Sequence, residues 1–391
     1  MGDRLIKLSL KPLLNTLILS LLVSLVACTP PQRISATERM FRPLSLEFVA
    51  QYEIPKDTFN NTKIGGLSAI SYNRQQDRFY VLSDDRGTRS PARFYTFKLE
   101  VAKTAEGQLK IASFQPEKVT FLKDEQGNNY QRESIDPEGL TLSPRNTIFI
   151  SSEGNPTKNI QPFIGEFSPD TGKKLFTLPL PQRYLNDPDA EQPQGIQENQ
   201  AFEALTINRT GLPEDPFRLF TATESALIQD RNPEEKAEES ARIRFLHYVI
   251  NPVGEPIVVA EHLYLLDPAP VEVIANGLTE LIALPTEGYL LSLERTFGFT
   301  GSGAKIFQVV IGNAVDTSNF ASLKGDVTSV RPLTKQLLLD LSQLGIYLDN
   351  LEAMTLGPRL PDGSQSLLLV SDDNFNDEQI SQLLLFRLVE K

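Results

Sequence analysis

Short apolar runs separated by turn residues dominate the chain after residue 43. Typical runs are RFYVLS at 78–83 and TIFISS at 147–152, rich in β-branched and aromatic residues. Turn sequences such as Ser143-Pro144-Arg145-Asn146 separate them, and long helical periodicity is absent. This pattern predicts an all-β fold.

The strand pattern repeats five times along the chain. Each repeat opens with Gly or Ala followed by Leu or Met, runs through two apolar stretches separated by a turn, and ends in an acid. The openings lie at 65, 138, 203, 276 and 352, so successive repeats begin 73, 65, 73 and 76 residues apart. Each of the first four repeats has room for four strands, which is typical of β-propeller blades.

The fifth repeat holds only three strand-like runs before the chain ends. A fourth run is available at the other end of the domain, in LSLEFVAQYEI at 44–54. Pairing the two would close the ring and remove its open edge. We therefore predict one β-propeller over residues 44–391, with five four-stranded blades closed by the N-terminal strand. A six-bladed ring with an irregular blade, or a β-sandwich whose strands resemble one another by chance, are the alternatives.

Residues 1–27 have the pattern of an export signal. A basic start is followed by an apolar run of 11 residues at 17–27, which is too short to span a bilayer. The small residues before Cys28 resemble a bacterial lipoprotein signal, so we expect lipidation of Cys28 and a flexible tether over 28–43. The expected location is the cell envelope, anchored to a membrane by lipid and facing the periplasm or exterior. A plain secretory peptide with an incidental cysteine is the alternative.

Composition narrows the possible chemistry. The chain has 50 Asp+Glu against 38 Lys+Arg, a net charge of -12, which argues against nucleic-acid binding. One cysteine and two histidines, His247 and His262 in apolar strands, leave few soft metal ligands. Any metal site would therefore use oxygen ligands. We expect a monomer whose partner is a small molecule.

Acids recur at the same points of the repeats. In a propeller blade the start of the first strand and the end of the second meet at one rim of the channel. The strand openings supply Glu138, Glu203 and Glu352. The strand ends supply Asp85, Glu153, Glu224, Glu294 and Asp373. Eight carboxylates around one channel would repel one another unless pKa values rise, bases approach or a cation binds.

A hard cation such as Ca²⁺ suits this set, because it takes six to eight oxygen ligands. The predicted ligands are Asp85, Glu138, Glu153, Glu224, Glu294, Glu352 and Asp373, and Asp136, Asn374 and Asn376 could complete the shell. Arg86 and Arg295, which directly follow ring acids, could instead neutralise part of the ring. The alternative is thus an acidic ring that only locks the blades together.

Several motifs resemble the phytase-like domain family, described by the phrase "esterase-like activity of phytase". The matching segments are Gly65-Gly66-Leu67-Ser68, Ser83-Asp84-Asp85-Arg86-Gly87, Asp136-Pro137-Glu138-Gly139-Leu140, Glu153-Gly154, Glu203-Ala204-Leu205-Thr206, Glu294-Arg295, Asn350-Leu351-Glu352-Ala353-Met354 and Ser371-Asp372-Asp373-Asn374. They cover essentially the whole predicted propeller. The resemblance implies hydrolysis of phosphoesters or esters, although the motifs of the calcium-dependent β-propeller phytases have no close match here.

Two functions are compatible with these features. The first is a surface-anchored, Ca²⁺-dependent hydrolase of phosphorylated or ester small molecules, with Glu203 as general base and Arg86, Arg295 and Lys305 binding phosphate. The second is a non-catalytic propeller that binds a ligand and holds a structural cation.

A glycine-rich segment at 298–305, GFTGSGAK, resembles a phosphate-binding loop only superficially. It lacks the Gly-Lys-Ser/Thr ending and lies between two predicted strands. We predict a blade loop that could bring Lys305 and backbone amides near an anion.

Overall fold

A computed structural model describes residues 35, 38–187, 191–208, 211–231, 240–268, 273–299 and 301–390. The chain divides into two units, Met1–Arg42 and Pro43–Lys391. The described part of the first unit contains one short 3-10 helix, η1 (Glu38–Met40). The predicted signal segment, Cys28 and most of the predicted tether lie outside the described residues. Within those residues, no helix has the length and apolarity needed to cross a membrane.

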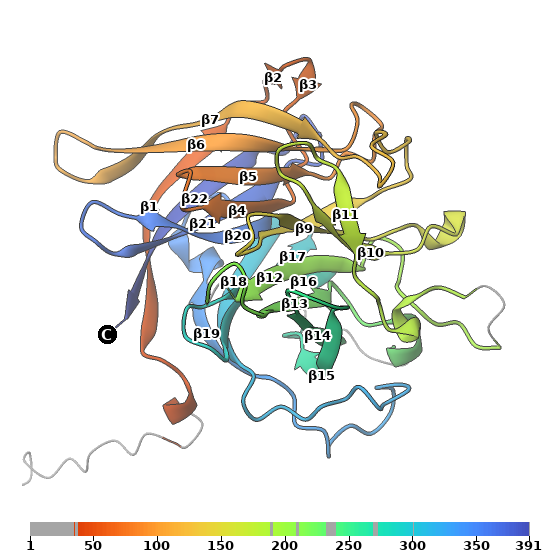
Figure 1. Ribbon diagram of the computed structural model, residues 1–391. Helices are drawn as coiled ribbons and strands as arrows, with labels where there is room; N and C mark the ends of the chain where they lie inside the picture. Colours follow the sequence, from red (N-terminus) through yellow and green to blue (C-terminus); the bar gives the residue numbers. More distant parts are fainter. Residues whose placement is uncertain are drawn as a thin grey trace, which may run out of the picture. The chain divides into compact units, whose positions relative to one another are not determined.

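Unit Pro43–Lys391 consists of five four-stranded antiparallel sheets, which are the five predicted blades (Figure 1). Blade 1 contains β4 (Ala69–Asn73), β5 (Arg78–Ser83), β6 (Arg93–Lys103) and β7 (Leu109–Phe121). Blade 2 contains β8 (Pro137–Leu142), β9 (Ile148–Ser152), β10 (Phe163–Phe167) and β11 (Lys174–Thr177). Blade 3 contains β12 (Phe202–Asn208), β13 (Phe217–Thr223), β14 (Arg242–Ile250) and β15 (Ile257–Leu265).

Blade 4 contains β16 (Val273–Ala283), β17 (Tyr289–Gly298), β18 (Gly301–Val310) and β19 (Thr334–Asp340). Blade 5 contains β20 (Asn350–Arg359), β21 (Gln365–Asp372), β22 (Ser381–Glu390) and β1 (Leu44–Ile54). The remaining elements are small: the hairpin β2 (Thr58–Phe59) and β3 (Thr62–Lys63), and the 3-10 helices η2 (Pro156–Lys158), η3 (Gln182–Tyr184), η4 (Ile228–Asp230) and η5 (Leu341–Leu344).

The N-terminal strand closes the ring. β1 pairs antiparallel with β22, from Leu44 opposite Glu390 to Ile54 opposite Ser381. The innermost strands β4, β8, β12, β16 and β20 contact one another in a complete cycle. The prediction of a five-bladed ring closed by residues 44–54 is therefore confirmed, and the six-bladed and sandwich alternatives are excluded.

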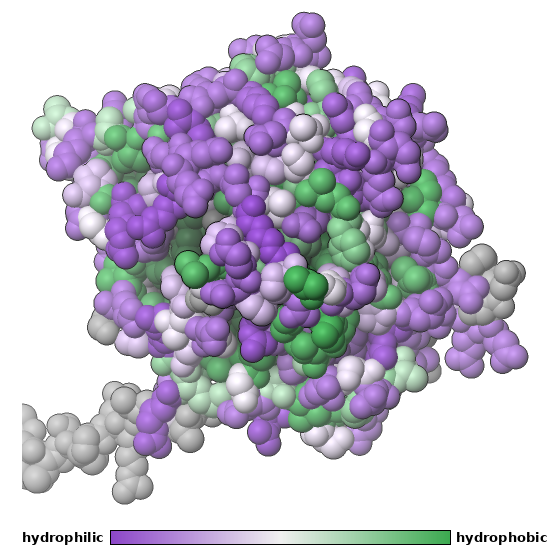
Figure 2. Space-filling model, in the orientation of Figure 1, coloured by the Kyte–Doolittle hydropathy of each residue, from purple (hydrophilic) through white to green (hydrophobic). Residues whose placement is uncertain are grey.

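Apolar side chains are buried between the blades. Phe94 of blade 1 and Ile150 of blade 2 share one buried cluster, and Leu293 of blade 4 and Leu369 of blade 5 share another. Both faces of a blade are therefore covered, which explains why inner strands read as continuous apolar runs. On the face shown in Figure 2, hydrophilic residues predominate and apolar residues form small separate patches.

Side chains connect neighbouring inner strands around the ring. Ser71 Oγ of β4 accepts the Leu142 N–H of β8 (3.1 Å), and Thr206 Oγ1 of β12 accepts the Ala283 N–H of β16 (2.9 Å). Glu280 of β16 is buried and accepts an N–H of β12 (3.2 Å). Burial raises the pKa of Glu280 well above its usual value, against the opposing effect of these backbone hydrogen bonds. These contacts satisfy backbone groups at strand edges that have no sheet partner.

Candidate functional site

One mouth of the ring encloses a polar cavity of about 270 Å³. Six carboxylates line it: Asp84, Glu138, Glu153, Glu203, Glu352 and Asp372. The other lining residues are Arg86, Arg295, Asn199, Asn350, Asn374, Gln379 and Phe297. Every blade or its adjoining loops contributes, because the inner strands begin and the second strands end at this mouth.

Seven of the residues that the sequence singled out meet here, including Asn374, which was expected to complete a ligand shell. The acids Glu138, Glu203 and Glu352 occupy equivalent positions near the starts of the inner strands β8, β12 and β20. Glu153 follows the end of β9. The arginines Arg86 and Arg295 also line the cavity. The predicted acidic rim therefore exists, but its membership differs in four blades, because Asp85, Glu224, Glu294 and Asp373 do not line the cavity.

Asp85 of blade 1 turns away from the cavity. It is 2 % exposed and pairs with the fully buried Arg93 (2.8 Å). It also accepts the Ser90 N–H (2.9 Å), so its role is to hold the loop after β5. Its neighbour Asp84 lines the cavity instead. The pKa of Asp85 is lowered, because hydrogen bonds that include those from Arg93 and Ser90 outweigh burial.

Asp373 of blade 5, like Asp85, is held by hydrogen bonds and does not line the cavity. Its Oδ1 accepts the N–H groups of Gly66 (2.9 Å) and Phe375 (3.0 Å), which connects blade 5 to the segment before blade 1. Asp372, one residue earlier, lines the cavity. In both blades the acid facing the cavity precedes the one we expected.

Glu294 and Lys305 of blade 4 lie outside the cavity. Glu294 forms an ion pair with Lys335, and Lys305 forms one with Asp267 (3.0 Å). Lys335 also pairs with Asp267 (2.9 Å), so two acids and two lysines satisfy one another. We expected Glu294 to be a metal ligand and Lys305 to bind phosphate. Neither expectation agrees with these positions.

Arg295 lines the cavity and forms an ion pair with Glu224, an acid that does not line it. It contacts Glu224 (2.7 Å), Asn350 Oδ1 (2.6 Å) and Glu352 (3.5 Å). Glu224 is 3 % exposed and does not itself line the cavity. Glu224 therefore neutralises Arg295.

Arg86 is held in a similar way. Its Nε lies 2.6 Å from Asp136 Oδ1, and its Nη2 donates to Asn199 Oδ1 (2.6 Å). Asp136 is 4 % exposed. Each cavity arginine is thus paired with a buried acid, so the carboxylates facing the cavity leave an excess of negative charge.

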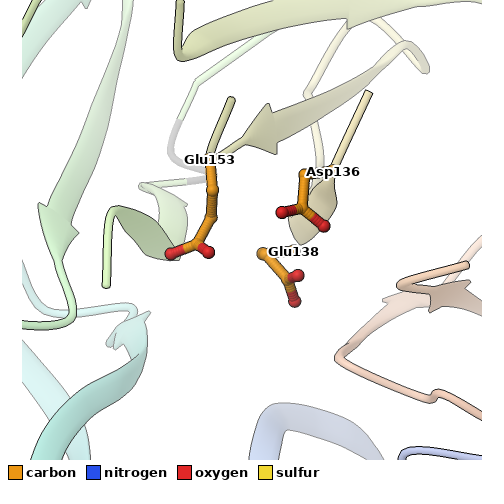
Figure 3. A group of neighbouring side chains, drawn as sticks. All are labelled: Asp136, Glu138 and Glu153. Atoms are coloured by element: carbon orange, nitrogen blue, oxygen red, sulfur yellow. The ribbon is translucent and has the colours of Figure 1, made fainter. Parts of the chain in front are cut away.

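Three acids at one side of the cavity form a candidate metal site. One oxygen from each of Asp136, Glu138 and Glu153 lies within 4.8 Å of the other two. Figure 3 shows the three side chains converging from β8 and the end of β9. Glu153 also accepts the Ala201 N–H, which fixes its orientation. The donor set consists entirely of oxygen, as a hard cation requires.

A second observation supports a bound cation. Glu203 Oε2 is buried, and no other described residue donates a hydrogen bond to it. Such an unsatisfied carboxylate oxygen is costly unless a proton, an ion or a ligand satisfies it. Burial and the neighbouring charges of Glu224 and Glu352 raise the pKa of Glu203 well above its usual value. Burial, and then the charge of Asp136, also raise the pKa values of Glu138 and Glu153 well above their usual values.

These pKa shifts predict how pH affects stability. Burial, and then the charges of Glu352 and Asp136, raise the pKa of Asp84 from 3.8 to about 7. In the folded protein Asp84 keeps a proton that the unfolded chain has already lost, so stability falls as pH rises through this range. We expect the ion-free protein to lose on the order of 2 kcal/mol of unfolding free energy between about pH 5 and pH 7.

Urea denaturation in EDTA at several pH values measures this effect. The variant Asp84→Asn should show a shallower dependence on pH, because one of the titrating groups is gone. Stability that stays level or increases from about pH 5 to pH 7 in the ion-free protein would contradict the prediction.

The fold and this site define a five-bladed β-propeller with an acidic channel mouth. Residues 62–375 match the family model described as "Phytase-like: Esterase-like activity of phytase". This match covers most of the sequence, and the chain belongs to the phytase-like family. A search of curated proteins finds no significant match.

Similar solved structures include other propellers. An endo-arabinase from Bacteroides thetaiotaomicron is 11% identical, with a TM-score of 0.41, covering 88% of this chain and 98% of its own. An α-L-arabinofuranosidase catalytic domain from Coprinopsis cinerea is 9% identical, with a TM-score of 0.37 and coverages of 89% and 98%. At this level of similarity, neither structure carries an argument about activity.

Proposed function

We propose that this protein is a Ca²⁺-dependent phosphoester or ester hydrolase that acts at the acidic channel mouth. The observation that carries the proposal is the convergence of Asp136, Glu138 and Glu153 beside Glu203 and its unsatisfied oxygen. Family membership supports the same class of reaction. The expected substrate is a small molecule with a phosphate or ester group.

The three clustered acids would hold the calcium ion. Bound calcium would supply the positive charge that attracts phosphate oxygens and would lower the pKa of a coordinated water. The acids hold Ca²⁺ only when ionised, so their raised pKa values favour release of protons as the ion binds.

Glu203 is the proposed general base. Its Oε2 takes a proton from water as the water oxygen bonds to phosphorus; the ester P–O bond breaks, the leaving alkoxide takes a proton from solvent water, and Glu203 returns its proton to solvent. Arg86 and Arg295, which both line the wall, would orient the phosphate oxygens by charge-assisted hydrogen bonds. Lys305 has no part in this proposal, since it is paired with Asp267.

We also propose that the mature protein is monomeric and anchored to the cell envelope through lipidated Cys28. The support is the sequence pattern of residues 17–28. Such an anchor would place the propeller in the periplasm or outside the cell.

Calcium-dependent hydrolysis tests the proposed function. We expect the mature protein to release phosphate from phosphate monoesters with Ca²⁺ and to lose the activity in EDTA. Glu138→Gln should weaken Ca²⁺ binding by at least about tenfold, because it removes one charged ligand. Glu47→Gln, at an exposed acid on the outer strand β1, is the matched control and should bind Ca²⁺ normally. The absence of Ca²⁺-dependent ester hydrolysis by the wild type would reject the proposal, even if Ca²⁺ binds.

A further inference from the structure

The β17–β18 hairpin of blade 4 places an aromatic residue at the acidic cavity. In this hairpin Arg295 lies opposite Ala304, and Phe297 lies opposite Ser302. Residues two apart on a strand face the same side, and both Arg295 and Phe297 line the cavity. Of the glycine-rich segment that we expected to be a loop, Gly298 ends β17, and residues 301–305 form the first part of β18.

Phe297 differs from its surroundings. It is 41% exposed, and among the described residues that line the cavity it is the only apolar one. An exposed aromatic ring beside charged groups gains free energy only when apolar surface covers it. Phe299 of the same hairpin is more exposed, at 84%, but it does not line the cavity.

The charges of the wall limit how many anionic groups a ligand can carry. Arg86 is already paired with Asp136 (2.6 Å) and Arg295 with Glu224 (2.7 Å). When ionised, as Ca²⁺ binding requires, the six cavity carboxylates outnumber the two arginines, so each additional phosphate would meet repulsion. A polyphosphorylated ligand such as phytate is therefore poorly matched to the wall, whereas one phosphate beside a bound cation is acceptable.

We infer that the substrate is a phosphate monoester with one phosphate and an apolar or aromatic alcohol group, and that Phe297 packs against that group and determines specificity. This inference rests on the proposed function, because it concerns the substrate of the same site. The two can still be separated by experiment, since recognition by Phe297 is measurable without turnover.

Binding of phosphonates tests recognition alone, because their P–C bond is not hydrolysed. Calorimetry on the Ca²⁺-loaded mature protein should show phenylphosphonate binding about tenfold more tightly than methylphosphonate, as expected for partial burial of an aromatic ring. Phe297→Ala should reduce this preference to less than about twofold, while Phe299→Ala, the matched control, should keep it. Equal binding of the two phosphonates, no binding of either, or an unchanged preference in Phe297→Ala would overturn the inference.

Initial rates on phenyl phosphate, glycerol phosphate and phytate test the substrate class. We expect phenyl phosphate to have the highest kcat/KM, and Phe297→Ala to raise its KM about tenfold without changing the KM for glycerol phosphate. Phytate as the best substrate would overturn the inference while supporting a hydrolase. A phenylphosphonate preference that depends on Phe297, without turnover of any ester, would reject the hydrolase and retain the binding role.

Discussion

A chain that begins at Pro55 is expected to lose the cooperative fold of the propeller. It lacks β1, which pairs with β22 along the outer edge of blade 5. Leu46 and Phe48 of β1 pack against the core between blades 4 and 5, and Tyr52 packs against the core between blades 5 and 1. Losing these contacts and the sheet pairing should cost roughly 5 kcal/mol or more, comparable with the whole stability of a typical domain.

A circular permutant is the matched control for this truncation. Leu44 lies opposite Glu390 in the antiparallel pair, so an Asn-Gly turn can join residue 390 to residue 44 as a hairpin. A permutant that begins at Pro55 and ends at Ile54 keeps every residue of β1. Its unfolding free energy in urea should be within about 2 kcal/mol of the wild-type value. A truncated chain that unfolds like the wild type would show that β1 does not stabilise the ring.

The ring was predictable because its five blades bury similar surfaces. Both faces of a blade are covered, so strands such as β9 and β21 are almost entirely buried and appear as apolar runs. The number of repeats gave the number of blades, and the missing strand of the last repeat indicated the closure by residues 44–54. Both features depend on local patterns that a sequence records directly.

The cavity was only partly predictable, because strand ends are less regular than inner strands. Glu138, Glu203 and Glu352 were identified correctly as facing one mouth. At the ends of the second strands, the pairs Asp84-Asp85 and Asp372-Asp373 look alike in the sequence. Their roles differ through tertiary partners, such as the buried Arg93 that holds Asp85.

The positions of other residues were harder to predict from the sequence. Asn199 and Gln379 line the cavity from segments outside the strands, where no periodicity indicates direction. Glu280 lies in an apolar stretch of β16, beside a shift in register between Leu278 and Glu280. A lone acid in an apolar inner strand was a usable signal of a special role. The backbone N–H groups that donate hydrogen bonds to it, however, are brought there by the three-dimensional arrangement.

Glu203→Gln is expected to lower kcat by about 10²- to 10⁴-fold, the usual contribution of a general base. The wild-type rate should rise with pH, because burial and the charges of Glu224 and Glu352 raise the pKa of Glu203 and only its ionised form accepts a proton. The variant should lose this dependence on pH. Its melting temperature should stay level or rise, since a neutral amide is not repelled by the neighbouring acids.

Asp85→Asn provides the control, because Asp85 is another acid of the predicted ring but faces away from the cavity. Removing its charge leaves the fully buried Arg93 without an ionic partner and should cost about 3–5 kcal/mol of stability. Its kcat, measured well below its melting temperature, should remain near the wild-type value. If instead Glu203→Gln destabilises the fold and alters no turnover, the ring acids are structural. The protein would then be a propeller that binds a ligand and holds a cation, because the carboxylate of Glu203 would stabilise the fold and take no part in turnover.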